Sequence, residues 1–140
     1  MTLTFTRFLA QFNSTGNDKA QGYDKSHFVG LSDDEKIKVF GLLEEELIAP
    51  GVIGWLFFLD TNKTEAALLN YLVSSKKPAA GSHRILIALY HYTQNERYLN
   101  DFEDDFHQLD EWEKEEAIQI YVEYVHEEER RSRFFKKIFG

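Results

Sequence analysis

Apolar residues recur at helical spacing along most of this chain. Three such stripes follow one another between residues 60 and 109, and they consist of Leu68, Leu69 and Leu72, then Ile85, Ala88, Leu89 and Tyr92, then Leu99, Phe102, Phe106 and Leu109. Spacings of three and four residues place side chains on one face of an α-helix. We therefore expect three consecutive helices here and take them as the centre of the fold.

Further helices are expected on both sides of this centre. Their apolar residues are Phe5, Phe8, Leu9 and Phe12, then Phe40, Leu43 and Leu47, then the almost wholly apolar segment 51–59, and finally Ile118, Tyr121, Val122 and Val125. Alternating Thr2, Thr4 and Thr6 leave a short strand open as an alternative at the N-terminus. Residues 13–30 are polar and contain three glycines, which indicates a long loop. A continuation of the last helix through Arg130 into Phe134 also stays open.

Helix starts are marked by a polar residue followed three positions later by an acid, as in a capping box. This spacing occurs at Ser32 and Glu35, Asn62 and Glu65, Thr93 and Glu96, and Asp110 and Glu113. Ser82 can cap the helix that carries Ile85, and Pro50 suits the first turn of the helix over residues 51–59. Pro78 and Gly81 punctuate the chain between two of the expected helices.

About seven helices joined by short turns predict an all-α fold of stacked antiparallel helical hairpins, because no hairpin turn such as Asn-Gly separates alternating runs. The cap positions 32, 62 and 93 are separated by 30 and 31 residues, the spacing of helix-pair repeats. Over roughly residues 31–125 the chain resembles HEAT-like helical repeats in architecture, without a diagnostic repeat motif. This resemblance implies a right-handed solenoid, and an irregular bundle is the alternative.

We expect one domain over residues 1–140, since 43% apolar and 15% aromatic residues are ample for a core. There is no cysteine, so thiolate chemistry and cysteine-bound metals are excluded. No secretory leader precedes the first helix, and the longest apolar run, residues 48–59, is too short to span a membrane. A cytoplasmic protein is expected.

Charge is distributed unevenly along the chain. The net charge is −8, and it divides into −1 over residues 1–100, −12 over residues 101–129 and +5 over residues 130–140. The acidic block would repel phosphate groups, so we expect no nucleic-acid partner. The basic extension over residues 130–140 could contact an anionic membrane, but docking on the acidic residues of the same chain, or fraying, is the preferred interpretation.

One pattern points to metal chemistry. An acid precedes a histidine by three residues at Asp24 and His27, at Asp104 and His107, and at Glu123 and His126. Two such pairs with further carboxylates can hold metal ions in a helical bundle. A metal-binding bundle with hydrolase or oxidase activity is therefore our second hypothesis, although exposed acids explain the pattern more simply and no metal or cofactor is predicted. We find no catalytic motif and expect no enzyme activity.

The leading hypothesis starts from acids beside an apolar stripe. Phe102 and Phe106 are expected to face inward, which turns the neighbouring acids outward into an acidic ridge with Trp112 as an aromatic anchor and Tyr98 nearby. The predicted partner-binding residues are Asp101, Glu103, Asp104, Asp105, Asp110, Glu111, Trp112 and Glu113. Charge steers a basic partner and an aromatic residue holds it. A soluble surface with Trp112 packed inward is the alternative.

In its size, acidity and helical content the chain is similar to bacterial immunity proteins. This resemblance implies an inhibitor that binds a basic protein, such as a toxin, and covers its active cleft with carboxylates.

Overall fold

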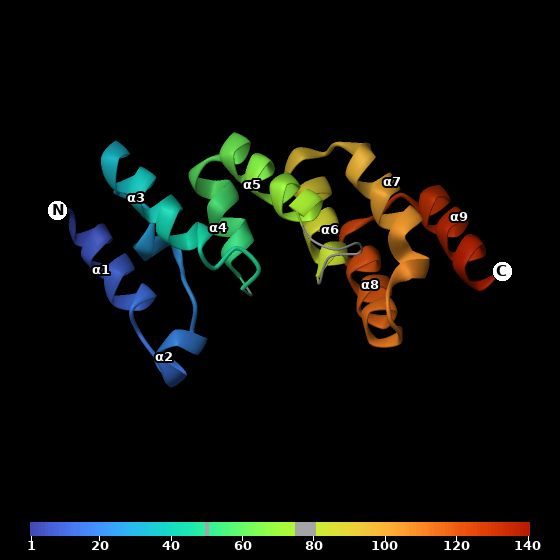
Figure 1. Cartoon of the computed structure of the whole chain (residues 1–140), viewed down its shortest axis with the longest axis horizontal. Helices are drawn as coiled ribbons and strands as arrows, with labels where there is room; N and C mark the ends of the chain where they lie inside the picture. Colours follow the sequence, from blue (N-terminus) through green and yellow to red (C-terminus); the bar gives the residue numbers. More distant parts are fainter. Residues whose placement is uncertain (50, 75–80) are drawn as a thin grey trace. The chain divides into compact units, whose positions relative to one another are not determined.

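The computed structural model describes residues 1–49, 51–74 and 81–140, and every regular element in these residues is helical (Figure 1). The all-α prediction is therefore confirmed. Pro50 and Pro78, which we expected at helix boundaries, lie outside the described residues. The elements are α1 (Leu3–Phe12), α2 (Gly16–Ala20), η1 (Lys25–His27), α3 (Asp33–Glu44), α4 (Val52–Leu59), α5 (Thr61–Ser74), α6 (Ser82–Thr93), α7 (Glu96–Asp105), η2 (Phe106–Gln108), α8 (Glu111–Tyr124) and α9 (Glu128–Phe139).

The described part has more helices than the seven predicted. The expected long loop over residues 13–30 contains the short helix α2 and the 3₁₀ turn η1. The last helix does not continue through Arg130, because α8 ends at Tyr124 and Val125 is extended. Arg131 binds the carbonyl groups of Val122 and Val125 with its guanidinium. It thereby satisfies carbonyls that the end of α8 leaves without helical partners.

Two predicted capping boxes are confirmed. The Ser32 hydroxyl accepts a hydrogen bond from the Glu35 amide at 3.2 Å, and the Glu35 carboxylate accepts one from the Ser32 amide at 2.9 Å. Asp110 and Glu113 make the same reciprocal pair at the start of α8. Both helices begin where the sequence predicted.

The other predicted caps were wrong because a different residue occupies the N-cap position of each of these helices. Asp60, rather than Asn62, accepts from the Lys63 amide at 2.9 Å, and Asn95, rather than Thr93, accepts from the Arg97 amide at 3.0 Å. Ser82 is the first residue of α6 and caps nothing, since left-handed Gly81 precedes it. The caps therefore fall at residues 32, 60 and 95, which is not the even spacing on which the repeat interpretation was based.

The chain groups into two compact units, residues 1–64 and 65–140, and the boundary between them falls within α5. In the first unit Phe8 is fully buried and contacts the rings of Phe12, Tyr23 and Phe28. The ring of Trp55 stacks on Phe28 with the centroids 4.4 Å apart. Its core comprises Phe8, Phe28, Leu31, Val39, Phe40, Leu43, Val52 and Leu56, contributed by α1, the segment before α3, α3 and α4.

Helix α4 packs into this core with one of its sides, and its other side is partly exposed. Val52, Leu56 and Phe57 are buried, but Phe58 is more than half exposed.

Glu35 joins the starts of α1 and α3. Its carboxylate accepts hydrogen bonds from the amides of Ser32 and Thr2 and from the Thr2 hydroxyl, at 2.9, 2.9 and 2.8 Å. Thr2 in turn caps α1 through the Phe5 amide. The two backbone donors lower the pKa of Glu35 from 4.5 to about 2, because they stabilise the ionised form.

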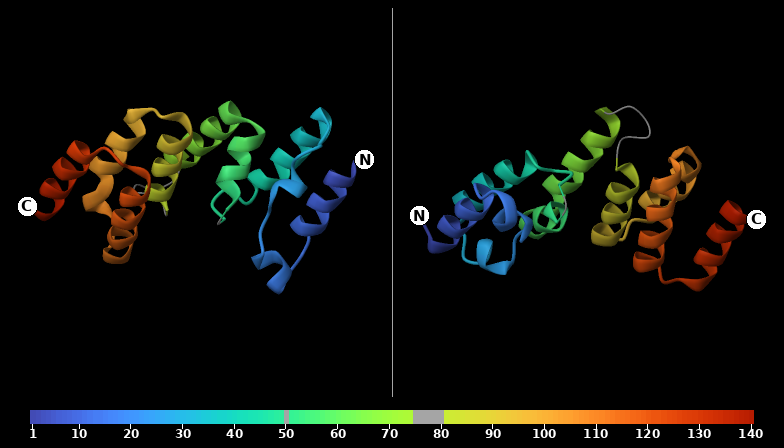
Figure 2. Two further views of the ribbon diagram at one scale, coloured as in Figure 1. Left: turned by 180° about the vertical axis from the view of Figure 1, so that it is seen from behind. Right: turned by 90° about the horizontal axis from the view of Figure 1, so that it is seen from below.

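In the second unit α6 packs against both α7 and α8 (Figure 2). The third predicted stripe is buried in full, namely Leu99, Phe102, Phe106 and Leu109. Tyr121 of α8 is fully buried, and its ring contacts those of Phe102 and Phe134 with centroids 5.7 and 4.3 Å away. Aromatic packing therefore connects α7, α8 and α9.

None of the helices in the described residues is long and apolar enough to cross a membrane.

Replacing Glu35 with Gln should destabilise the protein at neutral pH, because one oxygen that accepts a backbone hydrogen bond becomes an NH₂ group. The folded-state pKa is lowered, so the carboxylate stabilises the fold above pH 4.5 and this contribution is lost as the pH falls towards about 2. Urea unfolding at several pH values should show the gap between wild type and variant closing over that window. The control Glu44→Gln, an exposed position on the same helix, should show no such gap; equal behaviour of both variants contradicts the role of Glu35.

Replacing Phe134 with Ala should cost about 3–5 kcal/mol of unfolding free energy, the usual range for removing a buried Phe. Phe134 is 2% exposed, whereas Phe139 on the same helix is 71% exposed. The matched variant Phe139→Ala should therefore change stability by about 0.5 kcal/mol or less. Denaturant unfolding measures both, and similar losses would show that α9 is not anchored through Phe134.

Candidate protein-binding surface

The four acids of α7 predicted to bind a partner differ in how far they are exposed. Asp101 and Asp104 are exposed, Asp105 is half-buried, and Glu103 is half-buried on the flank of the helix that meets α8 and α9. Because the apolar stripe with Phe102 is buried, the prediction that Asp101 and Asp104 face outward is confirmed. The outward orientation expected for Glu103 was wrong.

Glu103 is held inside the second unit by two donors. Its Oε2 accepts a hydrogen bond from the Tyr121 hydroxyl at 2.9 Å and from Arg130 Nε at 2.9 Å. Burial, and then the hydrogen bond to Glu103, raise the pKa of Tyr121 far above its usual value. Arg130 also donates to Asn100 Oδ1 at 2.5 Å. A carboxylate paired in this way stabilises the unit and is not available to a partner.

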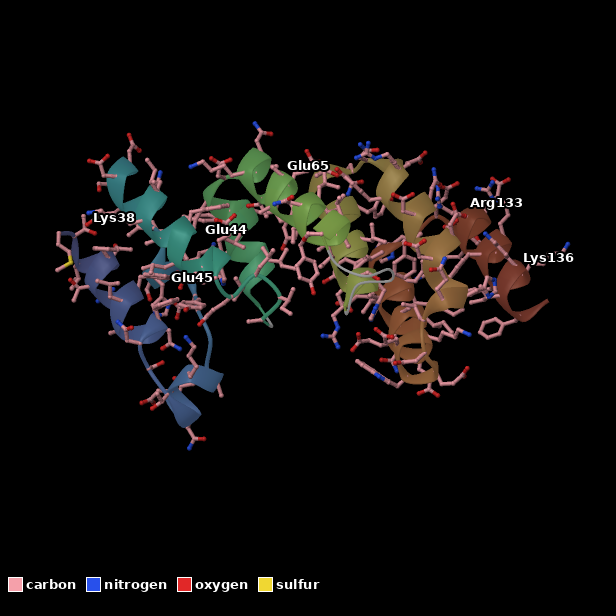
Figure 3. All side chains as sticks on the ribbon, in the orientation of Figure 1. Lys38, Glu44, Glu45, Glu65, Arg133 and Lys136 are labelled. Atoms are coloured by element: carbon pink, nitrogen blue, oxygen red, sulfur yellow. The ribbon has the colours of Figure 1, made fainter. Side chains whose placement is uncertain are left out.

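Three basic residues of the C-terminal extension bind groups of the same chain. Arg130 pairs with Glu103, Arg131 binds the end of α8, and Lys137 lies 3.4 Å from Asp104. The predicted docking of this extension on acidic residues of its own chain is therefore confirmed. Figure 3 shows Arg133 and Lys136 pointing outward from α9.

The first turn of α8 presents the clearest exposed anchor. Trp112 is 59% exposed, so the alternative in which it packs inward was wrong. Asp110 and Glu111 beside it are exposed, while Glu113 is half-buried and completes the capping box with Asp110. Tyr98 was expected nearby but is buried, and its hydroxyl donates to Glu65 at 2.7 Å.

Trp112 is held by residues that the sequence reasoning missed. The guanidinium of Arg84 on α6 lies over the Trp112 ring, 5.8 Å from its centroid. Arg84 also donates to Glu116 through Nε at 2.5 Å and through Nη2 at 2.7 Å. Trp112 and Glu116 are four residues apart on α8, so they share a side of this helix. One arginine therefore bridges both residues and limits the motion of Trp112.

A buried histidine completes this arrangement. His83 Nε2 lies 2.6 Å from Glu116 Oε1, and Nε2 carries the proton here because an ionised carboxylate only accepts hydrogen bonds. His83 Nδ1 has no hydrogen-bond partner among the described residues and lies 3.9 Å from Glu113 Oε2. The Arg84 hydrogen bonds, and then the one from His83, lower the pKa of Glu116 to about 2 although partial burial opposes the shift. The bonds to Glu116 correspondingly raise the pKa of Arg84.

The sequence offered only a faint signal for this cluster. Trp112 and Glu116 can be recognised as neighbours from their spacing, but Arg84 precedes Glu116 by 32 residues. Their contact exists because α6 and α8 pack together. A single sequence does not indicate that pairing.

The three acid–histidine pairs do not form a metal centre in the described residues, where no group of three or more potential ligands comes together. The Asp24 amide donates to His27 Nδ1 at 2.9 Å, and this pair caps η1. His107 and His126 are exposed, and His126 lies beyond the end of α8. The local role shown among these histidines in the described residues is that of His27 at the start of η1.

Comparisons with protein-family models, with curated proteins and with solved structures each give no match for this chain. Any function must therefore follow from its residues and their geometry.

Replacing Arg84 with Ala should increase the motion of Trp112, because the cation over its ring and the bridge to Glu116 are both lost. Time-resolved fluorescence anisotropy in a Trp55→Phe background observes Trp112 alone. We expect faster local depolarisation, with a stability loss of about 1 kcal/mol or less since Arg84 is half exposed. Arg97→Ala, which removes the arginine over Tyr98, is the control. Unchanged depolarisation in the Arg84 variant would show that Trp112 is not held by this contact.

Proposed function

We propose that this chain is a protein-binding module that inhibits a basic protein, in the manner of a bacterial immunity protein blocking a toxin. The observation that carries the proposal is the exposed Trp112, with the Arg84 guanidinium over its ring and the exposed acids Asp110, Glu111 and Glu115 close to it in the sequence. Tryptophan and arginine are the residues most enriched among those that dominate binding energy. Their combination at one exposed site supports recognition.

Prior ordering of the anchor favours binding. A side chain that is already held in place loses little conformational freedom when a partner packs on it. The bidentate bonds between Arg84 and Glu116 provide this order before any partner arrives. Trp112 would then contribute apolar contact at low entropic cost.

Negative charge supplies the second part of the proposed function. Asp101, Asp104, Asp110 and Glu111 are exposed, and residues 101–129 carry a net charge of −12. Such a field raises the association rate with a basic protein and falls with ionic strength. On a toxin whose cleft binds phosphate groups, these carboxylates would occupy the place of the substrate.

The internal pairing of Glu103 refines which residues would contact the partner. Glu103 accepts hydrogen bonds from Tyr121 and Arg130, and the Glu113 carboxylate accepts one from the amide of Asp110, the residue that caps α8. We therefore assign partner contact to Asp101, Asp104, Asp110, Glu111 and Trp112. Glu103 and Glu113 act by supporting the helices that present them.

Reversing two of these charges should slow association. The partner is first captured from cells that encode this chain, identified, purified and tested for inhibition of its activity. Stopped-flow association is then measured for Asp101→Lys/Glu111→Lys and for the control Glu44→Lys/Glu45→Lys, which changes the net charge equally on exposed residues of α3 and its end (Figure 3).

The first variant should associate about tenfold more slowly at low salt, and the control within about twofold of wild type. The difference should shrink as salt is added. Equal rates for the two variants, or rates indifferent to salt, would contradict an acidic binding surface in residues 65–140.

A further inference from the structure

The internal contact between Arg84 and Trp112 indicates which side chain a partner would use at this site. Within this chain an arginine lies over the indole ring and forms a bidentate pair with Glu116, four residues further along α8. A guanidinium binds an aromatic face and a carboxylate at the same time because it is planar and carries donors along its edge. The chain thus contains a working example of arginine recognition by Trp112.

A second set of carboxylates lies on the other side of Trp112. Glu111 and Glu115 are four residues apart and share one side of α8, whereas Glu116 lies on the side that faces Arg84. Glu115 is exposed and has no ion-pair partner among the described residues, and the Glu111 side chain is 96% exposed with Lys114 at 3.9 Å. With Arg84 already over its ring, Trp112 still remains 59% exposed.

We infer that the exposed part of Trp112, with Glu111 and Glu115, binds an arginine side chain of the protein partner and repeats the arrangement that Arg84 makes with Glu116. This inference rests on the proposed function and names the partner residue at its centre. We call these three residues the Trp112 site. Charge complementarity selects a cation, and the aromatic ring together with two carboxylates favours the flat guanidinium over the compact ammonium of lysine.

The contribution of neighbouring charges also favours a cation. From Asp110 to Glu116 the chain carries five acids and one lysine. Both hydrogen-bonding nitrogens of Arg84 face Glu116, and the one lysine of the segment, Lys114, lies 3.9 Å from Glu111. Glu111 and Glu115 therefore keep a negative potential beside the exposed indole, and an anionic or neutral side chain would gain less there.

The test uses short peptides as probes, because the partner is unidentified. The probe is the peptide acetyl-Gly-Arg-Gly-Arg-Gly-amide, compared with the same peptide carrying lysine and with one carrying neutral citrulline, which keeps the shape of arginine. Binding is followed through the indole N–H resonance of Trp112 in ¹H–¹⁵N NMR spectra of the full chain. The resonance of Trp55, the other tryptophan of the chain, is the internal reference.

We expect a saturable shift of the Trp112 resonance with the arginine peptide, a weaker one with lysine and none with citrulline. Glu111→Gln/Glu115→Gln should weaken arginine binding about fivefold, since two exposed charges are lost. Glu44→Gln/Glu45→Gln, the same charge change elsewhere, should leave it unchanged. No saturable shift of Trp112, equal binding of the citrulline peptide, or equal weakening in both variants would overturn the inference.

The peptide experiment can fail independently of the association experiment that tests the proposed function. If charge reversal at Asp101 and Glu111 slows association with the captured partner while the arginine peptide leaves Trp112 unperturbed, the binding module stands and the arginine site fails. If the peptide binds at the Trp112 site but association with the captured partner is indifferent to charge, the site is real and the proposed function fails.

Discussion

The second unit depends on the contacts of Tyr121. Its ring packs against Phe102 and Phe134, and its hydroxyl donates to Glu103, which also binds Arg130. One fully buried side chain therefore joins α7, α8 and α9 through apolar packing and through a hydrogen bond. The aromatic contacts favour burial, and the shared carboxylate satisfies polar groups that burial would otherwise leave unpaired. Helix α9 is anchored in the same core, since Phe134 also contacts the rings of Phe102 and Phe106 directly.

The same contacts divide the acidic block into structural and accessible residues. Glu103 faces inward with Arg130, whereas Asp101 and Asp104 on the same helix face solvent. The C-terminal bases are divided in the same way, since Arg130 and Arg131 are used inside the unit while Arg133 and Lys136 point outward. The net charge summed along the sequence is therefore larger than the charge on exposed side chains that have no partner within the chain. The exposed acids of the block include Asp101 and Asp104 on α7 and Asp110 and Glu111 at the start of α8.

Helix α8 is held in both of its halves. In the N-terminal half Glu116 binds Arg84 and His83 of α6, and in the C-terminal half Tyr121 enters the aromatic core. Trp112 is thus presented from a helix with little freedom to shift. In a recognition surface this rigidity matters, because an anchor that is ordered beforehand loses less entropy on binding.

Helix starts were predictable where a single capping residue was available. Ser32 with Glu35 and Asp110 with Glu113 were correct because this signal is local and both partners lie within one helical turn. The prediction failed at Asn62, where Asp60 stands two residues earlier and competes for the same role. The even spacing of caps, and with it the support for helical repeats, was lost for the same reason.

The sequence by itself determined the helical class, most helix positions, the buried stripe through Phe102 and Phe106, and the acidic composition. These follow from periodicity and from charge, which are local properties of the chain. Only the tertiary structure decided that Glu103 turns inward, that α9 folds back from α8, and that Arg84 holds Trp112. The contacts of Glu103 and of Arg84 join residues 18, 27 and 32 positions apart in the chain, and those of α9 with α8 join residues on two different helices. Such pairings are set by which helix faces pack together, and local pattern does not encode that choice.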